Sequence, residues 1–216
     1  MTAAEIIAPA VLDGWHELGG EKFEATISWP HDRPAGHMLS ANAVRLGGIL
    51  AAHLGYHVPT DHHVILERLS WQDSAAADTP ADAVRVEVLC HNAVLRRGQL
   101  TALAYTVSAC SSGTPRCRGE AELRFMSPGV YRFVRGTAAR NDHVPGLVLL
   151  ESALREAGMT APGGPIEVDA CFLRYAVRGK PWQVAASTEH GERGPVTVTV
   201  HQHDQDVLRA VVRRIP

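Results

Sequence analysis

Hydrophobic and polar residues follow two similar series along the chain, and each series predicts one helix among strands. In the first series, residues 23–29 alternate between apolar and polar, as in a half-buried strand. A helix is predicted at 38–54, where Leu39, Leu46 and Leu50 recur on one side. The Ala- and Asp-rich segment 74–83 predicts a solvated loop. The remaining strand-like runs of this series are at 64–71, 84–90, 100–109 and 117–125.

The second half of the chain repeats this order in a shorter form. A strand is predicted at 130–134 and a helix at 144–158. Four further strands are predicted at 166–175, 182–187, 196–201 and 207–213. A strand, a helix and four strands, twice over, predict an α+β fold in which each half wraps a bent antiparallel sheet around one helix. One such unit leaves a sheet edge exposed, and a second unit in the same chain can cover it.

The stretch 142–153 carries the pattern that points most clearly to chemistry. Pro145-Gly146 interrupts the preceding segment, and an apolar run at helical spacing follows it. Glu151 lies about 100° around the predicted helix from Leu150, at the edge of its apolar stripe. A carboxylate there costs free energy unless it is hydrogen-bonded or used in catalysis. His143, just before the helix, can reach the same space.

This pattern resembles the central helix of hotdog-fold enzymes that act on acyl thioesters. In their β-hydroxyacyl-ACP dehydratases, a Pro-Gly and four mostly apolar residues precede an acidic residue, and Pro145-Gly146 and Glu151 have that spacing. With Asp142-His143 before the Pro-Gly and Arg155 after Glu151, the string is most similar to the A-factor synthase-like (AfsA-like) hotdog proteins. Those proteins make precursors of γ-butyrolactone signals. Other segments that resemble this family are 48–53, 56–59, 127–132 and 172–175.

The resemblance covers nearly the whole chain and implies a double hotdog. In this fold two bent antiparallel sheets each wrap a central helix and pack as a pseudo-dimer. We expect an N-terminal unit at 1–128 and a C-terminal unit at 129–216, which carries the motif. The chain is shorter than typical members, and Asn42 stands where their first helix often carries an acid. At most one of the two units is therefore expected to hold an active site.

The resemblance also implies roles for residues of the motif. The thioester carbonyl of hotdog enzymes usually lies over the N-terminus of the central helix, where unpaired N–H groups and the helix dipole can polarise it. Gly146 is the expected donor, because an acyl group can approach its N–H closely. Glu151 is the expected general base, and His143 can share its proton or orient the substrate. The structural alternatives are a loop or capping role for His143 and a salt bridge between Glu151 and Arg155.

Two reactions fit this site differently. The histidine of hotdog dehydratases lies about eight residues before the Pro-Gly, and that position is Thr137 here. A dehydratase would have to use His143, or His31 or His37 of the first half. We therefore favour the AfsA-like reaction, in which a β-ketoacyl group moves from a carrier-protein thioester to a hydroxyl of an acceptor such as dihydroxyacetone phosphate. A dehydratase or thioesterase, or a non-catalytic acyl-binding protein, remains the alternative.

A phosphorylated acceptor requires cations near the site. Arginine pairs bidentately with phosphate oxygens, so arginines near the motifs are candidates. The residues expected to bind substrate are Asp142, Arg155, Arg174, Asn42 and Arg45, with Arg132 as a further candidate. The donor is expected to be a thioester of acyl carrier protein or of coenzyme A.

Composition limits the other classes of function. A net charge of −2 and a pI of about 6.6 give no basic field for nucleic acid. The apolar runs are too short to span a bilayer, and the first residues lack the features of a signal peptide, so a cytoplasmic protein is expected. The four scattered cysteines favour reduced thiols over disulfides or zinc. A monomer or a homodimer is compatible with the sequence.

Cofactor and metal signatures are absent from the sequence. There is no Gly-x-Gly-x-x-Gly motif, no Walker loop and no Gly-x-Ser-x-Gly elbow. His201 and His203 share a strand face, but no third ligand is clearly allied to them, so neither a metal nor a cofactor is predicted. Asp32, Asp61 and Asp73 lie in polar segments and are expected to be solvated.

Overall fold

The computed structural model describes residues 10–29, 36–74, 81–135, 143–159, 164–188 and 194–215. The strands are β1 (Val11–Gly19), β2 (Lys22–Ser28), β3 (His63–Asp73), β4 (Ala83–Arg96), β5 (Gln99–Ser111), β6 (Thr114–Met126), β7 (Ile166–Phe172), β8 (Gln183–Thr188), β9 (Val196–Gln202) and β10 (Gln205–Arg214). The helices are α2 (His37–Leu50), its π-helical extension η1 (Ala51–Gly55), α3 (Pro128–Arg135) and α4 (Gly146–Glu156).

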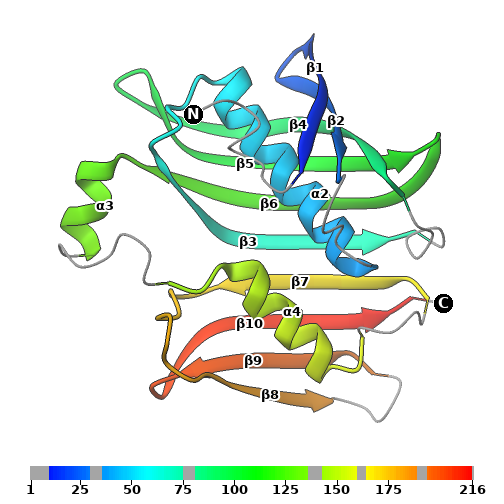
Figure 1. Cartoon of the computed structure of the whole chain (residues 1–216), viewed down its shortest axis with the longest axis vertical. Helices are drawn as coiled ribbons and strands as arrows, with labels where there is room; N and C mark the ends of the chain where they lie inside the picture. The colour runs from blue at the N-terminus through cyan, green and yellow to red at the C-terminus, as the bar shows by residue number, and fades with distance from the viewer. Residues whose placement is uncertain are drawn as a thin grey trace.

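The ten strands of the described residues form one antiparallel sheet, in the order β1-β2-β4-β5-β6-β3-β7-β10-β9-β8. Figure 1 shows α2 lying across the strands of the first half and α4 across those of the second, on the same side of the sheet. The two halves meet where β3 pairs with β7, so that Trp71 lies opposite Val168. The sheets predicted for the two halves are therefore joined edge to edge.

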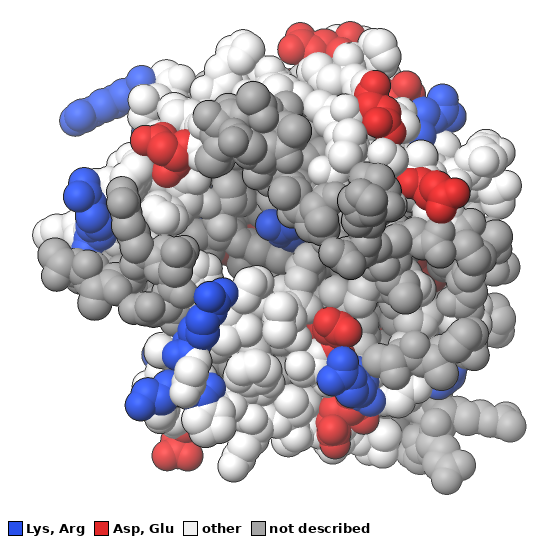
Figure 2. All heavy atoms as spheres, viewed as in Figure 1, with Lys and Arg blue, Asp and Glu red and all other residues white. Residues whose placement is uncertain are grey.

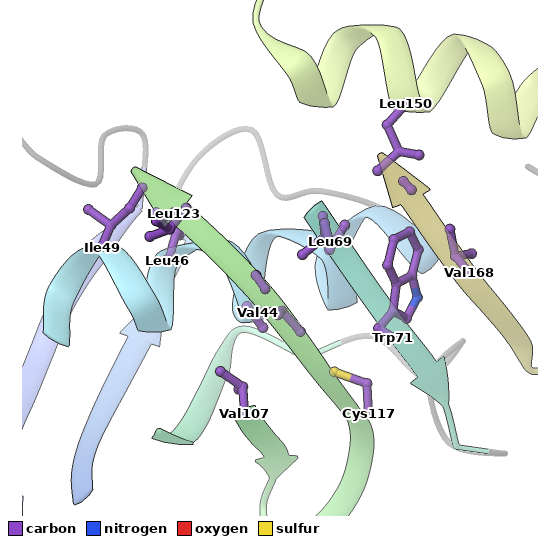
Figure 3. Packing of buried hydrophobic residues seen from close by; sticks show 14 of the residues in the cluster. Val44, Leu46, Ile49, Leu69, Trp71, Val107, Cys117, Leu123, Leu150 and Val168 are labelled. Carbon is purple, nitrogen blue, oxygen red and sulfur yellow. The ribbon is translucent and has the colours of Figure 1, made fainter. Parts of the chain in front are cut away.

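Alternating side chains bury one face of this sheet beneath the helices. In β9, for example, Val196, Val198 and Val200 are buried while the residues between them are partly exposed. Figure 3 shows how the core crosses the junction, with Trp71 of β3 beside Val168 of β7 and Leu150 of α4 above that strand. One continuous hydrophobic core therefore holds both helices on the sheet.

The strands predicted from alternation are confirmed, and most are longer than expected. The prediction of a strand at 130–134 is wrong, because these residues belong to α3. Pro128 occupies the first helical position, where its missing N–H has no cost and its fixed φ favours a helix. Val130, Phe133 and Val134 recur at helical spacing on the exposed side, and Phe133 is 91% exposed. The hairpin strand β1 was not predicted at all.

Glycine lets α2 pack close to the sheet. A Cβ added at Gly48 would lie 2.0–2.3 Å from atoms of the Tyr105 side chain. Tyr105 is fully buried on β5 and donates a hydrogen bond of 3.2 Å from its hydroxyl to the carbonyl oxygen of Val44, one turn earlier on the helix. The absent side chain thus sets the distance between the helix and β5.

We predict that Gly48→Ala destabilises the protein by about 1–3 kcal/mol, because overpacking of this size outweighs the gain of about 1 kcal/mol in helix propensity. Thermal or urea unfolding measures the change. Gly129→Ala is the matched control, since Gly129 is a helical glycine with nothing within 4 Å of the added Cβ. Equal stability of the two variants would contradict the close packing at Gly48.

Candidate functional site

A cavity of about 1010 Å³ lies between the first turns of α2 and α4. Figure 2 shows a hollow in the middle of this face, with Lys or Arg atoms at its bottom. The walls come from the starts of both helices, the first half of β3, the end of β6 and the end of β7. The polar residues that line it are His37, Asn42, Arg45, Glu67, Arg124, His143, Glu151, Arg174 and Tyr175.

Gly146 begins α4 at the wall of this cavity, with Pro145 at the N-cap. The first N–H groups of a helix have no partner within the helix, so this end is a donor site for an oxygen. A glycine was expected at this position to leave space for an acyl group. In the structure the space beside Gly146 is occupied by the Phe172 ring. The place of the missing Cβ lies 2.7 Å from Cε1 of Phe172, whose ring packs against the glycine.

His143 lies just before α4 and lines the cavity, as expected. Its backbone forms an isolated antiparallel bridge with Val177, and the next residue, Val144, donates to the carbonyl of Ala176 at 2.8 Å. The imidazole packs edge-on against the ring of Tyr175, with centroids 5.3 Å apart. These contacts tie the start of α4 to the segment after β7. Asp142 lies outside the described residues.

Glu151 lines the cavity but does not lie at a buried edge of the helix, so that expectation is wrong. Its side chain is 50% exposed and accepts a hydrogen bond of 3.3 Å from Arg155, one turn later. The helix turns Glu151 away from Leu150, which is fully buried against the sheet. An exposed pair of this kind contributes only a few tenths of a kcal/mol.

The candidate arginines differ in their surroundings. Arg155 is 69% exposed and does not line the cavity, and Arg132 is exposed on α3. Arg174 lines the cavity and donates to Gln205 at 3.2 Å. Arg124 also lines it and pairs with Glu67 at 2.7 Å. Two arginines of the cavity wall are therefore already engaged by side chains.

Arg45 differs from these arginines, because no described residue pairs with its guanidinium. It projects from α2 and is only partly accessible, and burial lowers the pKa of its guanidinium. Within the described part of the chain it has neither a hydrogen-bond acceptor nor a carboxylate partner. An arginine remains protonated near neutral pH, so this buried charge lacks an anion. Asn42, one turn earlier, is turned back to donate to the carbonyl of Met38 at 2.8 Å.

Sequence reasoning missed the partner of His37. This histidine begins α2, lines the cavity and lies 2.5 Å from Asp73, measured from Nδ1 to Oδ2. Asp73 is not solvated as expected, since its side chain is fully buried. The alternation of β3 contained the signal, because Leu69, Trp71 and Asp73 are two residues apart and share the buried face. The strand was predicted to end two residues too early.

The cysteines, the possible metal ligands and the helices of the described residues bear on the remaining predictions. All four cysteines are free, and burial raises the pKa of the Cys90 thiol to about 11 and that of Cys117 to about 12. Across the described ranges, no group of three or more His, Cys, Asp or Glu residues is arranged to hold a metal ion. His201 pairs instead with Asp206 at 2.8 Å. No helix in the part that the structure describes is long and apolar enough to cross a membrane.

Solved structures of known fold resemble this chain. An acyl-ACP thioesterase from Bacteroides thetaiotaomicron is similar with a TM-score of 0.61 at 13% identity, covering 89% of this chain and 97% of that one. The 12:0-ACP thioesterase from Umbellularia californica is similar with a TM-score of 0.58 at 13% identity, covering 92% and 98%. The chain therefore has a hotdog fold, as the resemblance implied.

Sequence comparison is more specific. The 2-oxo-3-(phosphooxy)propyl 3-oxoalkanoate synthase of Streptomyces coelicolor is 27% identical, covering 87% of this chain and 82% of that protein. The synthase of the same name from Streptomyces griseus is also 27% identical, covering 92% and 88%. No family model matches the chain. The chain is thus related to the A-factor synthase-like hotdog proteins, and this relationship places it among enzymes.

We predict that Gly146→Ala destabilises the protein by about 1–3 kcal/mol, because the new methyl group overlaps the Phe172 ring. Thermal unfolding of Gly146→Ala, Phe172→Leu and the double variant measures this contact as a double-mutant cycle. The double variant should be more stable than the sum of the two single effects predicts. Strict additivity would show that the ring does not restrict position 146.

Proposed function

We propose that the protein is an acyltransferase that moves a β-ketoacyl group from a carrier-protein or coenzyme A thioester to a hydroxyl of a small phosphorylated acceptor. The observation that carries this proposal is Arg45, a partly buried cation for which the described residues supply no anion, in a cavity that also holds the N-terminus of α4. The names of the related Streptomyces synthases describe an ester of a 3-oxoalkanoate with a phosphorylated three-carbon unit. An ester of that kind is the product of such a transfer.

The start of α4 is suited to bind the thioester carbonyl. The N–H of Gly146 points from the positive end of the helix dipole and can stabilise the oxyanion of a tetrahedral intermediate. Phe172 and Leu147 give this wall an apolar surface for the acyl chain. His143 lines the cavity just before the helix and is proposed to orient the substrate, with the help of Asp142.

The acceptor's phosphate is proposed to bind Arg45. A guanidinium and a phosphate form charge-assisted bidentate hydrogen bonds, and these are strong where water is largely excluded. Arg174 lies on the β7 side of the same cavity and can add a second contact, as can the amide of Asn42. Arg155 is better placed to hold Glu151 than to contact the acceptor.

Two helix-bearing units share this one cavity. We propose that residues 1–128 and 129–216 correspond to the two subunits of a hotdog dimer, fused into a pseudo-dimer by the pairing of β3 with β7. The cavity takes residues from both units, which supports this interpretation. A single site built by both halves also agrees with the expectation of at most one active site, which was based on Asn42 standing where an acid is often found.

The transfer is tested with a β-ketoacyl thioester and dihydroxyacetone phosphate. We expect a phosphorylated ester, detected by its mass, and release of the free thiol in equal amount. A 3-hydroxyacyl thioester without acceptor tests the alternative dehydratase, and thiol release without acceptor tests a thioesterase. Enoyl product or free acid in place of the ester would reject the transferase.

We predict that Arg45→Met raises the KM for the phosphorylated acceptor about 10- to 100-fold, because a charge-assisted hydrogen bond contributes about 1.5–3 kcal/mol. The KM for the thioester should change little. The variant should be at least as stable as the wild type, since the substitution removes a desolvated charge without a partner in the described chain. Steady-state kinetics and thermal unfolding measure both effects.

The matched control is Arg155→Met, which removes an exposed arginine outside the cavity wall. Its KM for the acceptor should remain within about twofold of the wild-type value, because an exposed pair contributes little. An equal loss of acceptor affinity in both variants would place the phosphate elsewhere than at Arg45.

A further inference from the structure

We infer that His37 is the general base of the transfer and that Asp73 is the residue that positions it. This inference rests on the proposed acyltransferase function and assigns its proton transfer to the first unit of the chain. The sequence pointed instead to Glu151 of the second unit. Burial and hydrogen bonding distinguish the two groups.

The geometry of His37 fixes which of its nitrogens is available. Nδ1 lies 2.5 Å from Oδ2 of Asp73, and the two side chains are 6% and 0% exposed. A carboxylate accepts, so Nδ1 carries the proton that it donates. Nε2 then holds a lone pair, and because His37 lines the cavity this nitrogen can accept a proton from a bound hydroxyl.

Burial of the Asp73 carboxylate costs desolvation free energy, which hydrogen-bond donors can offset. Its Oδ2 pairs with His37, while Oδ1 is buried and has no hydrogen-bond partner among the residues that the structure describes. A buried carboxylate that is satisfied on one oxygen alone costs free energy. Such a pair at the wall of a cavity is typical of a functional site, where a carboxylate orients the histidine and stabilises its protonated form.

Other candidate bases are less well placed. Glu151 is half exposed and already accepts a hydrogen bond from Arg155, so water and a cation compete for its lone pairs. His53 is buried but does not line the cavity, and its Nδ1 lies 2.7 Å from the carbonyl oxygen of Val58. His37 alone among these combines burial, a carboxylate partner and a place on the cavity wall.

In the proposed reaction His37 first accepts a proton and later returns it. Nε2 of His37 takes the proton of the acceptor hydroxyl while its oxygen forms a bond to the thioester carbon. The tetrahedral intermediate then collapses, the C–S bond breaks, and His37 returns the proton to the leaving thiolate. The products are the ester and the free thiol, and no oxidant or additional reactant is needed.

The experiment compares ester formation by wild type, His37→Ala, Asp73→Asn and Glu151→Gln. We expect kcat to fall about 10²- to 10⁴-fold in His37→Ala, the usual contribution of a general base. Added imidazole should restore part of this rate, because the truncated side chain leaves room for it in the cavity. Asp73→Asn should lower kcat with little change in either KM, and Glu151→Gln should lose less activity than His37→Ala.

Imidazole ¹⁵N NMR gives a readout that is independent of turnover. In the wild type, His37 should show a protonated Nδ1 and an unprotonated Nε2, and in Asp73→Asn a mixture of the two tautomers. His201→Gln is the control, since it removes a histidine that also pairs with an aspartate but lies outside the cavity wall. Its kcat should equal that of the wild type.

The outcomes separate this inference from the proposed function. If the wild type forms the ester and folded His37→Ala keeps its kcat within about tenfold, His37 is not the base and the transferase stands. If His37→Ala does not fold, an undiminished kcat in Asp73→Asn overturns the inference in the same way. If the wild type forms no ester, the proposed function is rejected, and the role of His37 as base of that transfer is rejected with it.

Discussion

The pairing of β3 with β7 is the interaction on which the site depends. It joins strands from the two halves of the chain through a backbone ladder from Arg68 opposite Cys171 to Gln72 opposite Glu167. On the inner face the ladder buries Leu69 and Trp71 against its neighbours, and on the outer face Arg68 forms two hydrogen bonds with Asp169. Because the ladder fixes one half against the other, the first turns of α2 and α4 border a single cavity.

This arrangement brings three sources of positive charge to one cavity. The N-terminal ends of two helices and the guanidinium of Arg45 contribute to the same cavity, and partial burial strengthens each of them. Among the described residues Arg45 has no anionic partner, and a desolvated charge of this kind costs stability. Under the proposed function, a bound phosphate would remove that cost by supplying the anion.

Burial also decides which of the acid and base groups are suited to chemistry. Glu151 and Asp73 are both carboxylates near the cavity, yet one is half exposed beside Arg155 and the other is enclosed against His37. An exposed charged group gains little interaction energy from its neighbours, because water screens it. A buried polar group depends on its neighbours for its hydrogen bonds. The buried pair of His37 and Asp73 lies in the first half of the chain, whose helix α2 carries Asn42 rather than an acid at that position.

Most of the strands, both long helices and the location of the motif could be predicted from the sequence. Strands such as β9 were predicted because alternation reports directly which face a strand buries, and α4 was predicted because Pro145-Gly146 precedes an apolar run at helical spacing. Segment 130–134 was misassigned because its apolar residues are exposed on a short helix, so burial could not guide the pattern. His143, Gly146, Glu151, Asn42, Arg45 and Arg174 were predicted to be site residues and do line the cavity.

The contacts that these residues make could not be predicted from the sequence, because they depend on packing. Local spacing cannot show that Glu151 turns toward Arg155 and water, that Phe172 fills the place of a side chain at Gly146, or that Arg45 lacks a partner in the described chain. The pair formed by His37 and Asp73 joins residues 36 positions apart. It exists because β3 continues two residues past Trp71 and brings a carboxylate to the start of α2. Such contacts depend on how strands and helices pack, which periodicity in the sequence does not encode.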